Sequence, residues 1–200
     1  MRVSYHAPCF TNQSKWVRQT AFHVVADTLY VDAVRWGWRP HRATRHVAPV
    51  NARIEKVARG PFFRQIWPYR AICPIDNWFE WVDEGGPKRQ PYLIRHRDGS
   101  PILCASIGQL PGPDEGQGAH DGFVIITADA QGGMVDLHDR RPVVLTPQLA
   151  RLWLDPATPK ERAEQMALTQ GEPAGCFAWF KANLRVGNVR NQGPELIESA

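Results

Sequence analysis

Short apolar or alternating runs, separated by turn residues, fill the first three-quarters of the chain and restrict its fold more than any other feature. The runs comprise residues 22–26, 29–36, 71–74, 78–82, 91–96, 102–107 and 123–127. Turn-forming stretches such as Glu84-Gly-Gly-Pro87 and Asp98-Gly-Ser100 lie between them. Runs of this length bounded by such residues are typical of strands. The order of the runs 78–82, 92–96 and 102–107 predicts an antiparallel meander.

Helix signals are few and lie mostly near the C-terminus. Residues 61–67 predict a short helix that starts at a proline. Thr146-Pro147 predicts an N-cap for a helix over 148–154, and Thr158-Pro159-Lys-Glu161 repeats the pattern with a capping-box glutamate. We expect an α+β fold in which a mixed, mostly antiparallel, strongly curved or barrel-like sheet carries peripheral helices. Because no repeat or long linker interrupts the chain, residues 1–200 are interpreted as one domain.

Composition excludes several classes of protein. A hydrophobic content of 43% is ordinary for a globular chain, and no apolar run reaches the roughly 18 residues that a membrane span needs. The N-terminus lacks a signal-peptide pattern, so we expect a cytoplasmic protein. The four cysteines, Cys9, Cys73, Cys104 and Cys176, are too far apart to form paired zinc ligands, and we expect neither metal nor cofactor. Cys73 and Cys104 are predicted to be buried thiols.

Positive charge is concentrated between residues 33 and 75. Nine lysines and arginines stand there against the single acid Glu55, so this segment carries +8 and the rest of the chain −4. Aromatic residues are interleaved with the cations, among them Trp36 and Trp38. Such a pattern fits single-stranded nucleic acid, because arginines follow phosphates while rings stack on bases. A solvated basic surface over an aromatic core explains the same composition equally well.

Three polar residues are candidates for chemistry. His138 lies in Met134-Val-Asp-Leu-His-Asp-Arg-Arg-Pro142, and Glu80 lies between aromatics in Trp78-Phe-Glu-Trp81. A histidine and a poorly solvated glutamate are suited to general acid–base catalysis. Asn51, in Asn51-Ala-Arg53-Ile-Glu55, can donate and accept hydrogen bonds without titrating. Taken one at a time, a turn cap, an ion pair and a local hydrogen bond explain the three residues as well.

Together the motifs are more specific. Asn51-Ala-Arg53-x-Glu55, Cys73-Pro-x-Asp76-x-Trp-Phe-Glu80-Trp81, Ile126-Thr127-Ala128 and His138-Asp-Arg-x-Pro142 resemble, in order and spacing, the SOS-response-associated peptidase (SRAP) family. The closing stretch from Val186 to Ile197 is similar to the tail of its bacterial members. The resemblance covers most of the chain from about Trp36 onward.

The resemblance implies a DNA-damage response protein that binds single-stranded DNA at abasic sites. In intact relatives an N-terminal cysteine forms a thiazolidine cross-link with the ring-opened sugar. The implied catalytic residues are Asn51, which orients the N-terminal residue, Glu80, which shuttles protons at the amine, and His138, which acts on the deoxyribose oxygen. The implied DNA contacts are Arg53 beside a phosphate and Thr127 in the same pocket, with Arg59, Trp36, Trp38 and Pro8 as further contacts.

The beginning of the chain departs from the family pattern. Family members begin Met-Cys-Gly-Arg, whereas this chain begins Met1-Arg2-Val-Ser, so we expect it to be N-terminally shortened and to lack the nucleophile. A misplaced start or a degenerate prophage relative would explain the difference. Cys9 could add to an aldehyde only as a hemithioacetal. Loss of a covering segment would leave a strand edge exposed, which predicts homo-association through the N-terminal region.

Other functions remain open at this stage. A non-catalytic single-stranded nucleic-acid-binding module needs only the basic segment. A thiol peptidase, which the family name suggests, needs an activated thiol beside a base, and no Cys-His pair is evident in the sequence. The sequence therefore leaves open whether the chain is an enzyme and, if so, whether it acts as an abasic-site cross-linking lyase or as a peptidase.

Overall fold

The computed structural model describes residues 17–43, 47–112, 118–188, 190–191 and 193–198. Pro8 and Cys9, and with them the predicted N-terminal association region, lie outside the described residues. The described chain folds into two β-sheets with three α-helices and four short 3₁₀ helices.

A seven-stranded sheet forms the larger part of the molecule. Its strands, in the order β2-β1-β4-β7-β8-β3 with β9 paired to β8, are β1 (Arg18–Val25), β2 (Thr28–Arg35), β3 (Asn51–Arg53), β4 (Arg70–Ile75), β7 (Ile102–Gln109), β8 (Gly122–Asp129) and β9 (Arg140–Pro142). All neighbouring pairs are antiparallel except β3 and β8, which are parallel. The predicted α+β class with mostly antiparallel strands is therefore confirmed.

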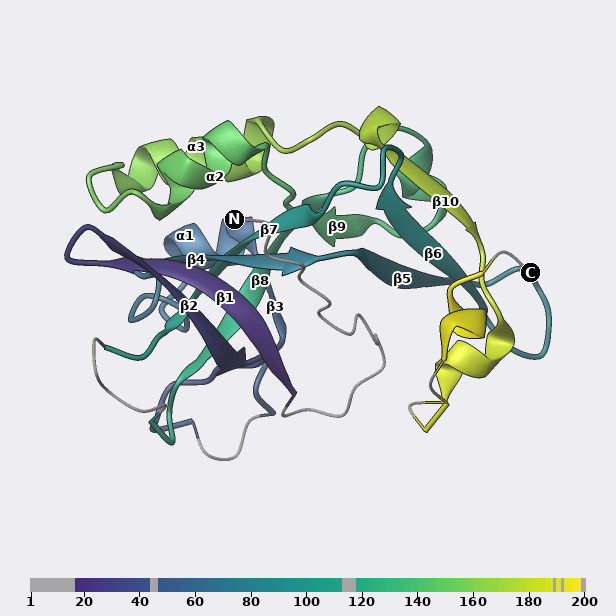
Figure 1. The fold of residues 1–200 in the computed structure, drawn as a ribbon, viewed down its shortest axis with the longest axis horizontal. Helices are drawn as coiled ribbons and strands as arrows, with labels where there is room; N and C mark the ends of the chain where they lie inside the picture. The colour runs from purple at the N-terminus through teal and green to yellow at the C-terminus, as the bar shows by residue number, and fades with distance from the viewer. Residues whose placement is uncertain (1–16, 44–46, 113–117, 189, 192, 199–200) are drawn as a thin grey trace.

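A second sheet of three strands lies at the other end of the molecule (Figure 1). Its order is β10 (Phe177–Lys181), β6 (Gln90–His96) and β5 (Asn77–Val82), and both pairings are antiparallel. Strands β4 and β5 follow each other across Asp76, so one stretch of chain passes from the large sheet into the small one. This arrangement brings the polar residues of β5 opposite the large sheet.

The predicted meander is correct only for its first hairpin. Strand β5 pairs with β6 as expected, but β7 pairs with β4 and β8 in the large sheet and not with β6. The reason is burial, because β7 lies between two strands and most of its residues are buried on both faces. Neighbouring strands of the sequence thus separate into different sheets.

The large sheet is open rather than closed into a barrel. An isolated parallel bridge joins Trp36 to Phe123, and Gly37 N–H donates to the Phe123 carbonyl at 2.8 Å, but β2 and β8 form no ladder among the described residues. This close approach needs Gly122, because a Cβ at that position would collide with the Gly37 carbonyl oxygen. The bridge fixes Trp36 beside the middle of the sheet.

Helices cover one face of the large sheet (Figure 1). They are α1 (Ile54–Arg59), α2 (Pro147–Leu154) and α3 (Lys160–Thr169). Thr146 caps α2 as predicted, since its side chain accepts a hydrogen bond from Leu149 N–H at 3.3 Å. The cap of α3 is Pro159 and not Thr158, and it makes no side-chain capping bond.

The helix predicted over 61–67 does not form, and α1 replaces it directly upstream. Residues 61–67 form bends and turns, in which Phe63 and Trp67 are buried. Pro61 and Pro68 bound the segment, and because a helix usually ends before a proline, only about six residues remain between them. This length favours turns over a helix. The short α1 was not predicted because its six residues show too few apolar positions for a clear helical period.

Two of the three hydrophobic clusters among the described residues follow from this layering. One lies between the large sheet and the helices and includes Ile72, Ile126 and Trp153. The other lies between the two sheets and includes Cys73, Trp78 and Phe177. Alternation along β4 and β8 explains the division, because successive residues of a strand point to opposite faces. Cys73 and Cys104 are both buried, as predicted.

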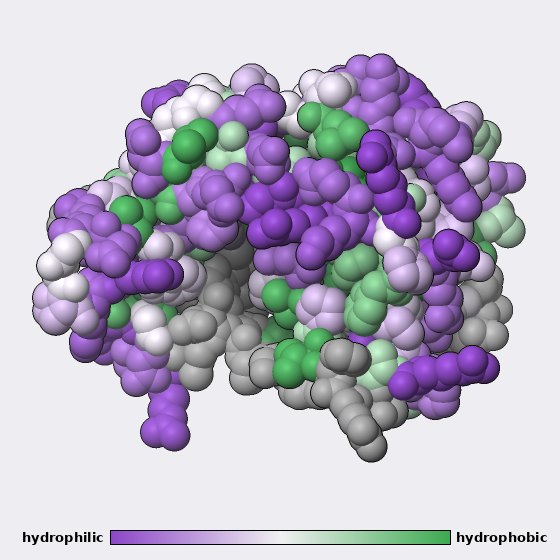
Figure 2. Space-filling view, turned by 180° about the vertical axis from the view of Figure 1, so that it is seen from behind, coloured by the Kyte–Doolittle hydropathy of each residue, from purple (hydrophilic) through white to green (hydrophobic). Residues whose placement is uncertain are grey.

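The described helices are all too short or too polar to cross a membrane. Hydrophilic residues cover most of the face in Figure 2, where hydrophobic residues form only small separate areas.

Candidate functional site

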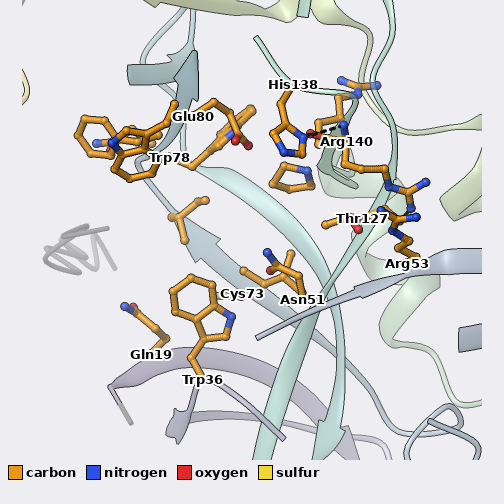
Figure 3. A pocket seen from close by; sticks show the side chains of 17 residues that line it. Gln19, Trp36, Asn51, Arg53, Cys73, Trp78, Glu80, Thr127, His138 and Arg140 are labelled. Carbon is orange, nitrogen blue, oxygen red and sulfur yellow. Dashed lines mark hydrogen bonds between the residues drawn. The ribbon is translucent and has the colours of Figure 1, made fainter. Parts of the chain in front are cut away.

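A cavity of about 470 Å³ opens between the two sheets and collects most of the predicted site residues (Figure 3). Asn51, Glu80 and His138, which are far apart in the sequence, all line it. The predicted DNA contacts Arg53, Thr127 and Trp36 line it as well. Six of the nine residues predicted for the site therefore share one hollow.

Strand β8 organises one wall of this cavity. Strand β3 runs parallel to it, with Asn51 opposite Ile125 and Arg53 opposite Thr127. On its other side β9 runs antiparallel, with Arg140 opposite Asp129. The Asn-x-Arg motif thus follows the two-residue period of a strand, which places both polar side chains on the same face.

Glu80 enters from the opposite wall, on β5 of the small sheet. Its side chain points across the cavity toward His138 (Figure 3). Burial raises the pKa of Glu80 from 4.5 to about 7, while the charge of His138 acts in the opposite direction. A carboxyl group with this pKa is partly protonated at neutral pH and can donate a proton as well as accept one.

His138 lies just after the 3₁₀ helix η1 (Gly132–Asp136), and its Nδ1 has a partner in either charge state. When the ring is neutral with its hydrogen on Nε2, Nδ1 accepts a hydrogen bond from the Arg140 backbone N–H at 2.9 Å, and in the other neutral tautomer Nδ1–H donates to the Arg140 carbonyl at 3.1 Å. When it is protonated, Nδ1 can donate to the Asp139 carboxylate, also at 2.9 Å. Nε2 has no hydrogen bond to a described residue and stays available for a ligand. The ring can thus change its charge without changing its orientation.

Arg140 adds a cation that is held in place by two acids. Its guanidinium pairs with Glu55 at 3.0 Å and with Asp129, and donates to the Thr127 carbonyl at 2.7 Å. These hydrogen bonds raise the pKa of Arg140 against the effect of its burial. Of the described residues that line the cavity, Glu80 is the one acid, whereas Arg53, Arg140 and Arg141 are cationic. The arrangement favours an anionic ligand.

Aromatic and amide groups form the other end of the cavity. Trp36 and Gln19 lie there together, away from the arginines (Figure 3). The indole of Trp36 is fixed by a hydrogen bond from Nε1 to the Val50 carbonyl at 2.9 Å. The ligand that suits this cavity is therefore charged at one end and carries a flat or apolar group at the other.

Three predicted contacts do not lie in the cavity. Trp38 is 1% exposed and packs against Phe62 and Phe63 in the core beneath the helices, so its ring cannot stack on a base. Arg59 is exposed at the end of α1 but does not line the cavity. Pro8 lies outside the described residues.

Several lining residues were not predicted. Arg140 could have been found, because it stands two residues after His138 in the same motif and a strand there would place it near the site. Trp78 shares a strand face with Glu80 for the same reason. Gln19 gave no signal in the sequence, since a single glutamine in a polar stretch has no distinguishing pattern.

The chain is similar to a family of known proteins and to curated relatives within it. The family model described as SOS response associated peptidase (SRAP) matches residues 6–189. The abasic site processing protein YedK of Escherichia coli is 43% identical over 171 residues, which span 85% of this chain and 75% of YedK. The abasic site processing protein YoqW of Bacillus subtilis is 29% identical over 83% of this chain and 75% of its own length.

Solved structures agree with these similarities. A phage-related protein from Bordetella bronchiseptica superposes with a TM-score of 0.70 at 35% identity, over 84% of this chain and 78% of that protein. A protein from Bacteroides thetaiotaomicron superposes with a TM-score of 0.72 at 22% identity, over 92% and 82% of the two chains, which shows that the fold is shared.

Proposed function

The chain belongs to the SOS response associated peptidase (SRAP) family, and from this premise we propose that it is a DNA-damage protein that binds single-stranded DNA at abasic sites. The proposed binding site is the cavity between the two sheets. The relatives named above as abasic site processing proteins support this choice of substrate.

The observation that carries the proposal is the meeting of Asn51, Glu80 and His138 in one cavity lined by arginines. A nucleotide that has lost its base leaves a sugar and a phosphate, which is an anionic group with reactive oxygens. Arg53 and Arg140 supply positive charge for the phosphate, and Arg140 keeps its orientation through Glu55 and Asp129. Trp36 offers a ring on which a neighbouring base can stack.

The proposed chemistry is opening of the abasic sugar. The closed sugar is a hemiacetal, and opening it removes the proton of the anomeric hydroxyl and delivers a proton to the ring oxygen. Glu80 in its protonated form can deliver that proton, because its pKa is raised to about 7. His138 can take the hydroxyl proton on Nε2 in the neutral tautomer whose Nδ1–H donates to the Arg140 carbonyl at 3.1 Å, and Asn51 can orient the resulting carbonyl.

Binding is tested by fluorescence anisotropy with a single-stranded oligonucleotide that contains one abasic site and with its undamaged counterpart. We expect the abasic strand to bind more tightly, and we expect both affinities to fall steeply with salt. Arg53→Met should lower the slope of log affinity against log salt by about one, because one phosphate contact is lost. Arg162→Met on α3, which lies outside the cavity, is the matched control. Affinity that does not respond to salt would contradict the proposal.

The chemistry is tested separately on a denaturing gel that follows the abasic oligonucleotide. We expect His138→Ala and Glu80→Gln to retain binding while strand cleavage or adduct formation falls by about 10²–10⁴, the usual contribution of a general acid or base. A non-catalytic binding module is the competing function. A wild-type protein that binds the abasic strand but leaves it unchanged on long incubation would favour that function.

Two further predictions from the sequence accompany the proposal. A cytoplasmic location remains a prediction. Homo-association also remains one, and it is supported by the large sheet, in which β2 is an edge strand with Leu29 and Val31 exposed. Light scattering at high protein concentration tests it, and a monomer across the whole range would contradict it.

A further inference from the structure

A second, smaller cavity of about 140 Å³ lies behind the β9 wall, between the large sheet and the end of α3. Its walls come from Glu55 on α1, Asp129 at the end of β8, Arg141 on β9 and the segment around Gly171. Thr169, the last residue of α3, also lines it. The proposed function makes no use of this cavity.

Arg141 brings a buried guanidinium with an unpaired nitrogen to this cavity. The residue is 7% exposed, and its Nη1 is buried without a hydrogen-bond partner among the described residues. Burial lowers the pKa of Arg141, with Cys176 and Glu172 acting in the opposite direction. Arginine nevertheless remains protonated at neutral pH, and a buried charge without a partner is strongly unfavourable. The guanidinium therefore has unused capacity to bind an anion.

The neighbouring acids form no hydrogen bond with the Arg141 guanidinium among the described residues, because each of them binds another residue. Glu55 and Asp129 both pair with Arg140. Glu172, which acts on Arg141 through its charge, accepts a hydrogen bond from His96 Nε2 at 2.8 Å. Arg140 and the two acids that pair with it together carry one negative charge, and Arg141 is the cation among the described residues that line the small cavity.

The Nη2 side of the guanidinium lies near Gly171. A Cβ built on Gly171 would lie 3.9 Å from Arg141 Nη2, and Gly171 itself lines the small cavity. The absence of a side chain at this position therefore leaves room beside the guanidinium. Asp129, whose side chain is 82% exposed, stands where the cavity reaches solvent, so a small ligand has a way in.

We propose that this cavity is a binding site for a single phosphate-class oxyanion, held by the guanidinium of Arg141. The planar fork of an arginine matches two oxygens of a phosphate in a bidentate contact. The cavity of about 140 Å³ is large enough for a phosphate group and much smaller than the 470 Å³ cavity between the sheets. The proposal is independent of the function proposed for the larger cavity.

The first experiment is isothermal titration calorimetry with inorganic phosphate, with sodium chloride used to hold the ionic strength constant. We expect one saturable site in the wild type. Arg141→Met should weaken binding at least about tenfold, because hydrogen bonds to a charged group are lost. Arg162→Met makes the same change in net charge outside the cavity and should bind phosphate as the wild type does. Wild-type protein without saturable binding would overturn the proposal, as would equal binding by Arg141→Met.

Thermal unfolding gives a second readout of the same site. In phosphate-free buffer Arg141→Met should unfold at a higher temperature than the wild type, because it removes an unpaired buried charge. Added phosphate should raise the unfolding temperature of the wild type and leave that of Arg141→Met unchanged. A variant that is less stable than the wild type, together with a wild type that phosphate does not stabilise, would show that Arg141 is already satisfied and would overturn the proposal.

Gly171→Ala tests the site without removing its charge. The new methyl group would have ordinary clearance, with the Val144 carbonyl oxygen at 3.6 Å, so the protein should fold. It would occupy the space beside Nη2, and we expect weaker phosphate binding with little change in stability. Unchanged affinity in this variant would contradict the placement of the anion.

The source of the phosphate group can be identified in the same assay. Arg141 also lines the large cavity, so a backbone phosphate of a bound strand could reach it. If a single-stranded oligonucleotide displaces inorganic phosphate, the natural occupant is a strand phosphate. If both bind together without competition, the occupant is a free anion. Either result upholds the oxyanion site, whose existence is decided by the two preceding experiments.

Discussion

Arg70 and Arg141 are buried to nearly the same extent, at 8% and 7% exposure, but their surroundings differ in the hydrogen bonds that they offer to the guanidinium. Arg70, the first residue of β4, donates to the carbonyls of Trp153, Asp155 and Thr158, at and after the end of α2, at 2.6, 2.7 and 2.9 Å. Arg141, in the wall between the two cavities, has a buried Nη1 with no partner among the described residues. Residue type and burial alone therefore do not separate a structural arginine from one that is available to a ligand.

The same contrast extends to the groups around each arginine. Near Arg70 the polar atoms are paired, and Trp153 Nε1 also donates to the carbonyls of Ala71 and Ser106. In the large cavity Glu80 is buried enough to raise its pKa to about 7, and His138 keeps Nε2 without a described partner. The paired groups near Arg70 contribute stability. In the large cavity, by contrast, buried or unpaired polar groups lack partners that a bound ligand could supply.

The largest effect is expected when the paired region is broken. Arg70→Met should lower the free energy of unfolding by about 3–5 kcal/mol, because three carbonyls lose a charged donor and two of these hydrogen bonds are buried. Urea denaturation at pH 7 measures the change. Arg64→Met, an exposed arginine of the same basic segment, is the control and should be neutral. A loss of less than about 1 kcal/mol for Arg70→Met would remove the distinction between the two regions.

A smaller effect of opposite sign is expected at Glu80. Its pKa is raised in the folded state, so the folded protein holds a proton that the unfolded chain releases, and stability falls as the pH rises from 4.5 to about 7. Glu80→Gln removes this loss and should be more stable than the wild type at pH 8 by about 1–3 kcal/mol. The difference should vanish near pH 4.5. A variant that is less stable at pH 8 would mean that the carboxylate is well accommodated.

The smallest effect on stability is expected at His138, whose side chain is 47% exposed. His138→Ala should change the free energy of unfolding by no more than about 0.5 kcal/mol, as is usual for exposed positions. His96→Ala is the informative counterpart, because His96 is 6% exposed and bonds Glu172 and Ser100. It should cost about 1–3 kcal/mol. Equal effects in urea denaturation of the two variants would show that His138 is structural.

Local patterns were sufficient to predict most strands, and together with the family resemblance they predicted six of the residues that line the large cavity. Alternation over a few residues gives a strand, and Glu80 between aromatics signals a poorly solvated acid from its neighbours alone. The pairing of the strands depended on distant partners. The parallel contact of β3 with β8, and the separation of β7 from β6, follow from burial of both faces of β7 and could not be obtained from either strand by itself.

The two tryptophans at positions 36 and 38 show why side-chain placement was harder. Two residues apart in an extended segment, they are expected to point the same way. Gly37 between them has a φ of 121°, a conformation that favours glycine, and the chain turns there. Trp36 enters the cavity while Trp38 is buried in the core. The burial of Arg70 could not be predicted from its neighbours in the sequence either, since its carbonyl partners come from residues 153–158.

Nuclear magnetic resonance of Glu80 tests the central claim most directly. The chemical shift of the Glu80 carboxyl carbon, followed through a pH titration, should change with a midpoint near pH 7 in the protein alone. An oligonucleotide with one abasic site should shift this midpoint, and the undamaged strand should leave it in place, because only the lesion can enter between Glu80 and His138. A midpoint near 4.5, or an equal response to both strands, would contradict the account.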